Sequence, residues 1–581
     1  MASPPPSSAA QTPGVARPGR RASDHAGRML LAGAWLAAAI VAAPVLALFV
    51  IALGGDASTA RHVGVNVLPR ALLDTGLLLA GVAVVTSLLG VGAAWLVTAY
   101  RFPFRDLLAA GLVLPLAVPT YIVAYVYVEL LEPLGPVQTA LRGLLGYRTK
   151  AEYWFPEVRS MPGAILILGA VLYPYVYLTA RALFAVQSAN LLEAARTLGA
   201  GPWETFRTIA LPLARPALAL GLSLALLETL NDIGASEHLG VRTLTVSIYA
   251  TWLNRGSLPG AAQIACVMLV LVVAILWMEA RARGGRSFDG SVKRPRPVSP
   301  LPLSGAGAWA ATVLCALPVA VGFLIPVAFL AREAIARTLR AGVPDEIAAA
   351  LGASLVLAGT ATVIVVALGA LVAAAVRLVR RPRVALLGRI AALGYALPGT
   401  VLAVGLLWPL AAVDNAVANA WRGLTGISPG LILTGSGAAV VIAYAIRFLG
   451  IASGGIESGM SRISRHIDDA ARTLGRRPGG VLREIHLPLA RPALISAALL
   501  VFVDAMKELP ATLLLRPLNI DTLATLLYAQ ASRGAFDEGA LAALAIVAVG
   551  IVPVVALMRV SSPATPPEAA AVEEAAGLSR A

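Results

Sequence analysis

Long apolar runs separated by short polar segments dominate this chain. About twelve of the runs approach or exceed the roughly 20 residues that a helix needs to cross a bilayer. They are Leu30–Leu53, Ala71–Tyr100, Leu107–Leu131, Gly163–Val186, Ala217–Ala235 and Gly260–Trp277 in the first half, and Ala308–Leu330, Leu351–Val376, Ile390–Ala412, Leu431–Ile451, Ala493–Leu515 and Ala540–Met558 in the second. A spanning β-strand would alternate apolar and polar residues. The pattern therefore predicts an all-α integral membrane protein with about twelve transmembrane helices.

Composition agrees with this prediction. Of 581 residues, 58% are hydrophobic and only 13% are charged, whereas roughly a quarter are charged in soluble domains. The first run, Leu30–Leu53, is longer than the apolar region of a secretory signal peptide, so we expect an uncleaved first helix. Both cysteines lie within apolar runs, which argues against a disulfide framework or a CxxC site.

The charge distribution predicts an orientation. The net charge is +15, and most of the basic residues occupy short loops, which indicates membrane topology rather than a nucleic-acid partner. With the amino terminus in the cytoplasm, about 31 basic residues lie inside and about 15 outside. Since short cytoplasmic loops carry the excess of Lys and Arg, we expect both termini to be cytoplasmic.

The chain also repeats itself. Glu193–Leu218 and Asp469–Leu494 are identical at 17 of 26 positions, at an offset of 276. Weaker matches at offsets up to 279, such as Pro119 with Pro398, extend the repeat into the apolar runs. An even number of spans separates the copies, so the two halves share one orientation. The prediction is two homologous six-helix halves related by an axis along the membrane normal.

These observations divide the chain into five parts. They are a disordered cytoplasmic tail at 1–28, a first half at 29–280, a cytoplasmic linker at 281–306, a second half at 307–560 and a cytoplasmic tail at 561–581. The linker boundary rests on a stretch rich in Pro, Arg and Ser between the two sets of apolar runs.

The repeated segment has the features of a docking loop. An acidic residue is followed by two alanines, which allow another surface to approach closely, and then by a glycine that permits a turn. The candidate docking residues are Glu193, Ala194, Ala195 and Gly199 in the first loop and Asp469, Ala470, Ala471 and Gly475 in the second. The alternative is an amphipathic loop retained by gene duplication. None of the five histidines has a metal-ligand spacing, and we expect a structural or surface role for His486 within the second loop.

The order Glu-Ala-Ala, then Gly, then Ile-x-Leu-Pro resembles the signature loop of binding-protein-dependent ABC importer permeases, although the second copy begins with Asp469. The resemblance implies a type I permease fold in the inner membrane of a bacterium. It also implies that each short helix docks on a cytoplasmic ABC ATPase, so that the eight candidate residues would couple ATPase closure to the membrane helices. Further partners would be a periplasmic or lipid-anchored solute-binding protein and the lipid bilayer.

The chain has no phosphate-binding loop of its own. Such a loop ends in Gly-Lys-Ser/Thr, and none of the three lysines, Lys150, Lys293 and Lys507, follows a glycine. We therefore expect a transport subunit that is not itself an enzyme, that needs no cofactor and that recruits two copies of a separate ATPase subunit. A secondary transporter that uses buried acids as proton or sodium sites is the alternative.

The cargo is predicted from resemblance. Phe502–Pro517, Asp521–Thr525 and Gly240–Tyr249 resemble stretches of the fused, double-length permeases for ferric iron. Related fused permeases for thiamine or aminophosphonates, and unfused ones for polyamines, share much of the architecture. We expect ferric iron, with these as alternatives.

Two acid pairs lie at the same depth in equivalent helices. Glu228 and Asp232 match Asp504 and Glu508, and a spacing of four places each pair on one helix face. Acids within a membrane are costly and usually face a cavity or a partner. One hypothesis is that four carboxylates guide a hard cation such as Fe³⁺ along a central pathway. The alternative is that Lys507 and nearby arginines neutralise them as structural ion pairs.

The longest outer segment is Glu132–Pro162, which contains Tyr153 and Trp154. It is hydrophilic and lies between the third and fourth predicted spans. Two roles are open at this point: contact with a soluble binding protein that delivers substrate, or a cap that packs over the helices.

Overall fold

The computed structural model describes residues 20–186, 197–283, 300–379, 381–474, 476 and 478–561. Within these residues, ten helices are long and apolar enough to cross a membrane, or up to twelve if each of two bent pairs forms one span. Apart from one pair of two-residue strands, the regular structure in this part of the chain is helical. The prediction of an all-α integral membrane protein is confirmed.

In the first half the elements are α1 Arg20–Leu53, α2 Ala57–His62, η1 Val63–Val67, α3 Leu68–Ala99, β1 Tyr100–Arg101, α4 Arg105–Gly111, η2 Leu114–Ala117, α5 Thr120–Leu131, α6 Pro136–Leu145, η3 Lys150–Glu152, α7 Met161–Val186, α9 Pro202–Thr205, η4 Phe206–Ala210, α10 Leu211–Asn231, α11 Gly234–His238, α12 Leu244–Tyr249, η5 Ala250–Asn254 and α13 Leu258–Arg283. The η elements are single π or 3₁₀ turns, several of which continue directly into an α-helix.

In the second half they are β2 Leu301–Pro302, α14 Gly305–Val319, η6 Ala320–Leu324, α15 Ile325–Ala341, α16 Asp345–Leu378, α17 Pro382–Ala392, η7 Leu393–Ala396, α18 Gly399–Thr425, α19 Ala438–Ser461, α20 Arg465–Thr473, α21 Pro478–Val481, η8 Leu482–His486, α22 Leu487–Leu489, α23 Arg491–Met506, α24 Pro510–Leu515, α25 Leu523–Ser532 and α26 Phe536–Ser561. The order of long helices repeats that of the first half.

The third span of each half is broken, where the sequence predicted one continuous helix. The chain bends by 93° between Arg105–Ala117 and Thr120–Leu145, and Pro119 lies at the break with extended backbone. Pro398 holds the same position between η7 and α18. Proline lacks an N–H donor and disfavours helix in the residue before it, so each proline ends one segment and starts the next.

Other predicted ends also need correction. The predicted span Ala217–Ala235 stops at Asn231, and the predicted span Ala493–Leu515 divides into α23 and α24. The predicted span Leu431–Ile451 begins only at Ala438, because Asp414 accepts backbone N–H groups from Ile432–Thr434 and holds that stretch as a loop. Helix α1 begins at Arg20, inside the predicted tail.

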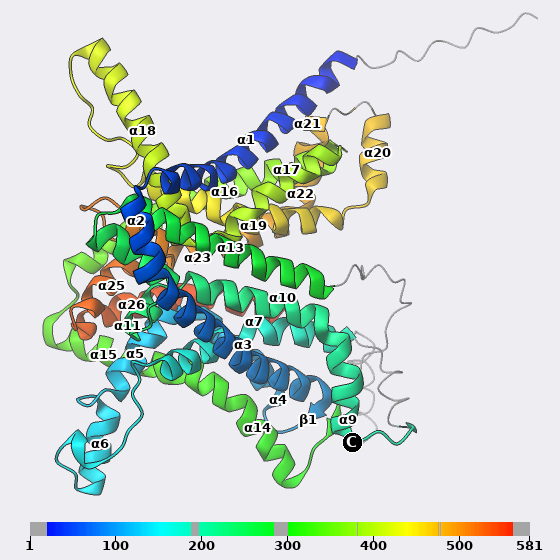
Figure 1. The fold of residues 1–581 in the computed structure, drawn as a ribbon. Helices are drawn as coiled ribbons and strands as arrows, with labels where there is room; N and C mark the ends of the chain where they lie inside the picture. The colour runs from blue at the N-terminus through cyan, green and yellow to red at the C-terminus, as the bar shows by residue number, and fades with distance from the viewer. Residues whose placement is uncertain are drawn as a thin grey trace, which may run out of the picture.

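The first span of each half packs against the other half (Figure 1). Helix α1 contacts α16, α17 and α18, whereas α14, η6 and α15 contact α3, α4, α5 and α7. Both crossings bring backbones into close approach. A Cβ on Gly405 would lie 2.3 Å from the Pro44 carbonyl oxygen, and one on Gly322 would lie 2.4 Å from that of Ala170. Glycine is required at both crossings, and the halves form one interlocked unit.

The strand pair ties the start of the second half to the first. Tyr100 pairs with Leu301 and Arg101 pairs with Pro302 in parallel, and the Leu303 N–H donates to the Arg101 carbonyl at 2.9 Å. The lead-in to α14 is thereby held at the end of α3, next to α4, against which α14 packs.

The repeated loops occupy one face of the molecule. Helices α9 and α20, one from each loop, lie at the same end of the helix bundle, whereas α6 projects from the opposite end (Figure 1). We call these the loop face and the arm face. Most of the long helices run between the two faces, whereas α18, like α6, projects beyond the arm face (Figure 1).

Candidate functional site

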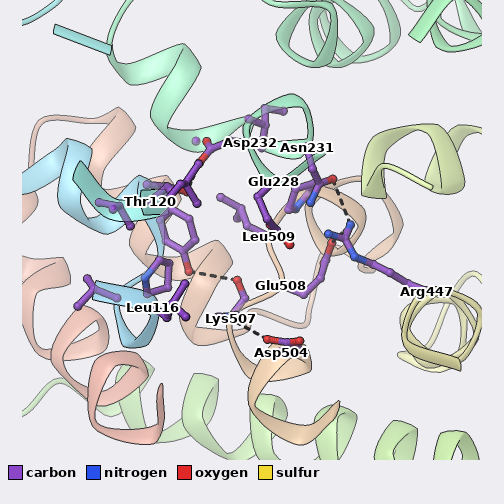
Figure 2. A pocket seen from close by; sticks show the side chains of 18 of the residues that line it. Leu116, Thr120, Glu228, Asn231, Asp232, Arg447, Asp504, Lys507, Glu508 and Leu509 are labelled. Atoms are coloured by element: carbon purple, nitrogen blue, oxygen red, sulfur yellow. Dashed lines mark hydrogen bonds and ion pairs between the residues drawn. The ribbon is translucent and has the colours of Figure 1, made fainter. Parts of the chain in front are cut away.

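A small cavity of about 100 Å³ lies where the broken spans of the two halves meet. All five residues predicted for a substrate pathway, Glu228, Asp232, Asp504, Lys507 and Glu508, line it (Figure 2). The other polar groups in the lining are Thr120, Tyr121, Tyr175, Asn231, Tyr395 and Arg447. The structure therefore brings together side chains that the sequence could relate only by repeat position.

Glu508 holds the start of the short helix α24. It is 4% exposed, and its carboxylate accepts the backbone N–H of Ala511 at 2.9 Å, the N–H of Thr512 at 3.0 Å and the Thr512 hydroxyl at 2.6 Å. An Arg447 Nη1 atom lies 3.4 Å from Glu508 Oε1. The positive end of a helix favours such a carboxylate. This acid has a capping role in the break of its span.

Asp232 has the equivalent capping role in the first half. It follows the last residue of α10, is 7% exposed, and accepts the Ala235 N–H at the start of α11 at 2.7 Å. The Thr120 hydroxyl, from the start of α5, donates to its other oxygen. The later member of each acid pair therefore accepts at least two hydrogen bonds from helices that follow a break.

Glu228 and Asp504, the earlier members, have fewer partners. Glu228 accepts one hydrogen bond, from the Tyr395 hydroxyl at 3.1 Å. Asp504 pairs with Lys507 Nζ at 2.9 Å, and both side chains keep about a quarter of their surface accessible, 25% and 29%. These two carboxylates retain lone pairs that a cation in the cavity could use. Figure 2 shows both among the side chains that line the cavity.

Arg447 joins the two halves across the cavity. Its Nη1 atom donates to Asn231 Oδ1 at 3.2 Å, and the same oxygen accepts the Gly399 N–H at 2.7 Å. Sequence analysis did not select Arg447, Asn231 or Tyr395. A lone arginine inside the predicted span Leu431–Ile451 was a usable signal, because charged residues in spans usually face a polar interior. Tyr395 carried no comparable signal.

The charge of the cavity is negative. Its lining holds four carboxylates against two cations, Lys507 and Arg447, which leaves a formal charge of −2. In the part of the chain that the structure describes, no three His, Cys, Asp or Glu side chains gather closely enough to hold a metal ion. The lining therefore combines a net negative formal charge with the lack, among the described residues, of a closed set of metal ligands.

The repeated loops are described in part. Glu193, Ala194, Ala195 and Gly475 lie outside the described residues. Gly199 has a φ of +88°, a conformation that L side chains rarely adopt. In α20, Asp469 and Ala470 are exposed, whereas Ala471 is 4% exposed and packs towards the spans. One side of α20 thus faces solvent with a carboxylate and a methyl group.

Two leucines at equivalent positions of the loops were missed by the sequence analysis. Leu198 is 88% exposed and Leu474 is 82% exposed, and they are 276 residues apart. Their equivalent positions and high exposure make them candidates for a contact surface. The high sequence identity of the two loops was a signal that could have pointed to these leucines. The exposed fraction of a side chain, however, cannot be read from sequence.

The segment 132–162 forms an arm at the arm face. Helix α6 projects from the bundle (Figure 1), and Gln138, 2% exposed, fastens the arm by donating to the Leu131 carbonyl and accepting from the Tyr153 hydroxyl. Trp154 is 86% exposed. The arm has an ordered base with an exposed tryptophan next to it in the chain, so contact with another protein stays an open role.

Comparison with known proteins agrees with the fold. The family model described as "Binding-protein-dependent transport system inner membrane component" matches residues 86–284 and 365–565. The chain is 25% identical to the Fe(3+)-transport system permease protein FbpB 2 of Haemophilus influenzae over 521 residues, 88% of this chain and 94% of the relative. It is 31% identical to the molybdenum transport system permease protein ModB of Escherichia coli and 28% identical to the sulfate transport system permease protein CysT of the same species, each over 208 residues. These are 35% of this chain and 87% and 72% of the relatives. The predicted duplication is confirmed.

Proposed function

The chain belongs to the inner membrane components of binding-protein-dependent transport systems, and we propose that it carries ferric iron into the cytoplasm as the permease of an ATP-driven importer. It is a fused, double-length permease, since the family model matches each half once. Transport would proceed by alternating access, in which the two halves rock about the central cavity.

The cavity between the broken spans is the observation that carries this proposal. Broken helices inside a membrane protein are tolerated where they line a cavity, and substrate sites of transporters often lie at such breaks near the repeat interface. Here both halves contribute a break and an acid pair to the same space. The cavity therefore has the position and the polarity of a substrate pathway.

A cation fits this space better than an anion. The relatives named for molybdenum and sulfate match 35% of the chain, and an oxyanion would meet the net formal charge of −2 in the cavity lining. The relative that matches nearly the full length is named for Fe(3+). Oxygen ligands such as Glu228 and Asp504 suit hard cations. With a volume of about 100 Å³, the cavity has room for an ion with a few waters.

Energy would come from outside the chain. The sequence has no Gly-Lys-Ser/Thr loop, and two equivalent loops on one face support two copies of a cytoplasmic ATPase. Leu198 and Leu474, both exposed, would enter apolar grooves on the two ATPase copies. The loop face would then be cytoplasmic, together with both termini, and the arm face would meet the solute-binding protein.

Reconstitution tests this function. The permease would be purified with its partner ATPase and binding protein and placed in liposomes, and uptake of ⁵⁵Fe³⁺ would be compared with uptake of thiamine, an aminophosphonate, a polyamine, molybdate and sulfate. We expect ATP-dependent iron uptake only. ATP-dependent uptake of another member of the panel would overturn the cargo. Uptake without the ATPase that collapses with the ion gradient would overturn the mechanism.

A further inference from the structure

A buried charged cluster fastens the second repeated loop to the spans. Asp468, next to the exposed Asp469, points inward from α20 and is 2% exposed. One of its oxygens accepts from His486 Nε2 at 2.6 Å, and the other lies 3.1 Å from Arg377 Nε and 3.0 Å from Arg377 Nη2. His486 is fully buried. We call these three residues the Asp468 cluster.

The Asp468 cluster connects four elements. Arg377 lies in the last turn of α16 and also donates to the carbonyl oxygens of Met460, in α19, and Ile463, just after it, the latter at 3.0 Å. His486 ends η8, the turn that leads into α22 and α23. Helix α20 is thus joined at one point to the ends of two spans and to the start of a third.

The carboxylate is held in its charged form. Burial alone raises the pKa of Asp468, but the hydrogen bond from His486 and the charge of Arg377 outweigh it and leave the pKa below its ordinary value. In the described residues His486 Nδ1 has no hydrogen-bond partner, so the imidazole contacts Asp468 through the proton on Nε2. A buried ion pair from which one partner is removed leaves the other charge uncompensated.

The first half has different residues at the matching positions. At the offset of 276, Asp468 corresponds to Leu192 and His486 corresponds to Ala210. Arg377 corresponds to Arg101, which lies in β1 and whose carbonyl accepts from Leu303. Leu192 lies outside the described residues, but neither Leu nor Ala can supply a carboxylate or an imidazole. The polar cluster belongs to the second loop alone.

We propose that Asp468, His486 and Arg377 are positioning residues that make the second coupling loop a stiff link between the ATPase and three spans, so that the two loops are not mechanically equivalent. This inference rests on the proposed role of α20 as an ATPase docking helix. A displacement of α20 by the ATPase passes through Asp468 to α16 and through His486 to α23. At the matching positions the first loop has Leu192 and Ala210, which cannot form this link.

The test replaces Asp468 and His486 in the second loop by the residue types found at the matching positions of the first loop. The double variant D468L/H486A would be compared with H466A, which removes an exposed histidine from the same helix. H486Q is the conservative variant, because its amide Nε2 can donate where the imidazole Nε2 does. A double spin label, at Thr473 in α20 and at the exposed Leu339 in α15, with both native cysteines replaced, reports the distance between the two sites and so the position of α20 in the permease alone. Iron imported per ATP hydrolysed is measured in the complete complex.

We expect D468L/H486A to broaden the label's distance distribution and to lower the iron imported per ATP at least fivefold, while H486Q and H466A stay within twofold of the parent. An unchanged distribution or an unchanged ratio in D468L/H486A overturns the inference. If that variant does not reach the membrane, D468N, which removes only the charge, is measured in its place by the same criteria. A470E separates the two proposals: if a bulky acid on the exposed side of α20 leaves uptake intact, docking at α20 itself is wrong.

Discussion

Replacing each acid of the cavity by its amide should separate transport from folding. Glu228 accepts one hydrogen bond, from Tyr395, and a glutamine carbonyl can accept the same bond, so E228Q should change the free energy of unfolding by less than about 1 kcal/mol. At an effective dielectric constant of about 20, a unit charge about 6 Å from a cation contributes roughly 3 kcal/mol per cationic charge. Since about 1.4 kcal/mol is a factor of ten, uptake at limiting iron should fall at least tenfold.

Glu508 should show the opposite result. E508Q removes one of the two oxygens that accept from Ala511 and Thr512 and leaves Arg447 buried opposite a neutral group. Breaking a buried pair in this way costs about 3–5 kcal/mol. We expect lower yield in the membrane and an apparent Tm reduced by roughly 5 °C or more.

The assay is initial ⁵⁵Fe³⁺ uptake into proteoliposomes, normalised to permease content, beside thermal unfolding of the purified protein followed by size exclusion. The control is D345N/E346Q, which neutralises two exposed carboxylates in the first turn of α16 on the arm face. Because Asp504 could substitute for Glu228, the decisive variant is E228Q/D504N. Normal uptake by a normally expressed E228Q/D504N refutes the pathway role, and a lowered Tm in E228Q refutes the distinction between capping and facing acids.

Three further outcomes follow from the structure. L198D and L474D should each weaken co-purification of the ATPase and together abolish it, whereas L339D, at an equally exposed leucine of α15, should not; retention by the double variant contradicts docking through these side chains. Because the pKa of Asp468 is lowered in the folded chain, its stabilising effect is present above about pH 4 and is lost as pH falls through the folded value. Amide exchange in α20 should therefore be equally protected between about pH 5 and about pH 8, and a loss of protection near neutral pH would count against the assignment. G405L should destabilise the crossing of α1 and α18 by about 1–3 kcal/mol, seen as a lower Tm, since its Cβ meets a backbone carbonyl.

The spans were predictable because a run of about 20 apolar residues has the length of a helix that crosses a bilayer and is seldom found in other structures. The breaks were not predicted, although Pro119 and Pro398 were noticed as repeat partners. Average hydropathy is the same for a straight helix and for one that bends by 93° at a proline. Whether a proline kinks a helix or ends it depends on partners for the freed backbone groups, and here those partners come from distant segments, as when Asn231 receives the Gly399 N–H.

The sequence was enough to select the acids of the candidate site as a group, but not to tell which of them cap helices. A spacing of four within each acid pair, repeated 276 residues later, was enough to place Glu228 and Asp504 with their partners in one space. It could not say that Asp232 and Glu508 cap short helices, because capping depends on α10 ending at Asn231 and α23 ending at Met506. The ion-pair hypothesis fits Asp504 with Lys507 and Glu508 with Arg447, whereas the pathway hypothesis stays a prediction.

Fusion of the two halves gives the cavity a charge that neither half could produce as a symmetric dimer. Two copies of the second half would supply Asp504 and Glu508 twice but also Lys507 and Arg447 twice, for a formal charge of zero. Two copies of the first would supply four carboxylates and no cation, because Asn231 stands where the second half has Lys507. Four uncompensated acids in one small buried cavity would repel one another or take up protons. One copy of each half leaves a formal charge of −2, with Arg447 paired to Glu508 and Lys507 paired to Asp504. The Asp468 cluster, whose carboxylate and imidazole only the second loop has at these positions, is a further difference between the halves, on the loop face. Because both halves belong to one chain, each half always assembles with the other and not with a copy of itself.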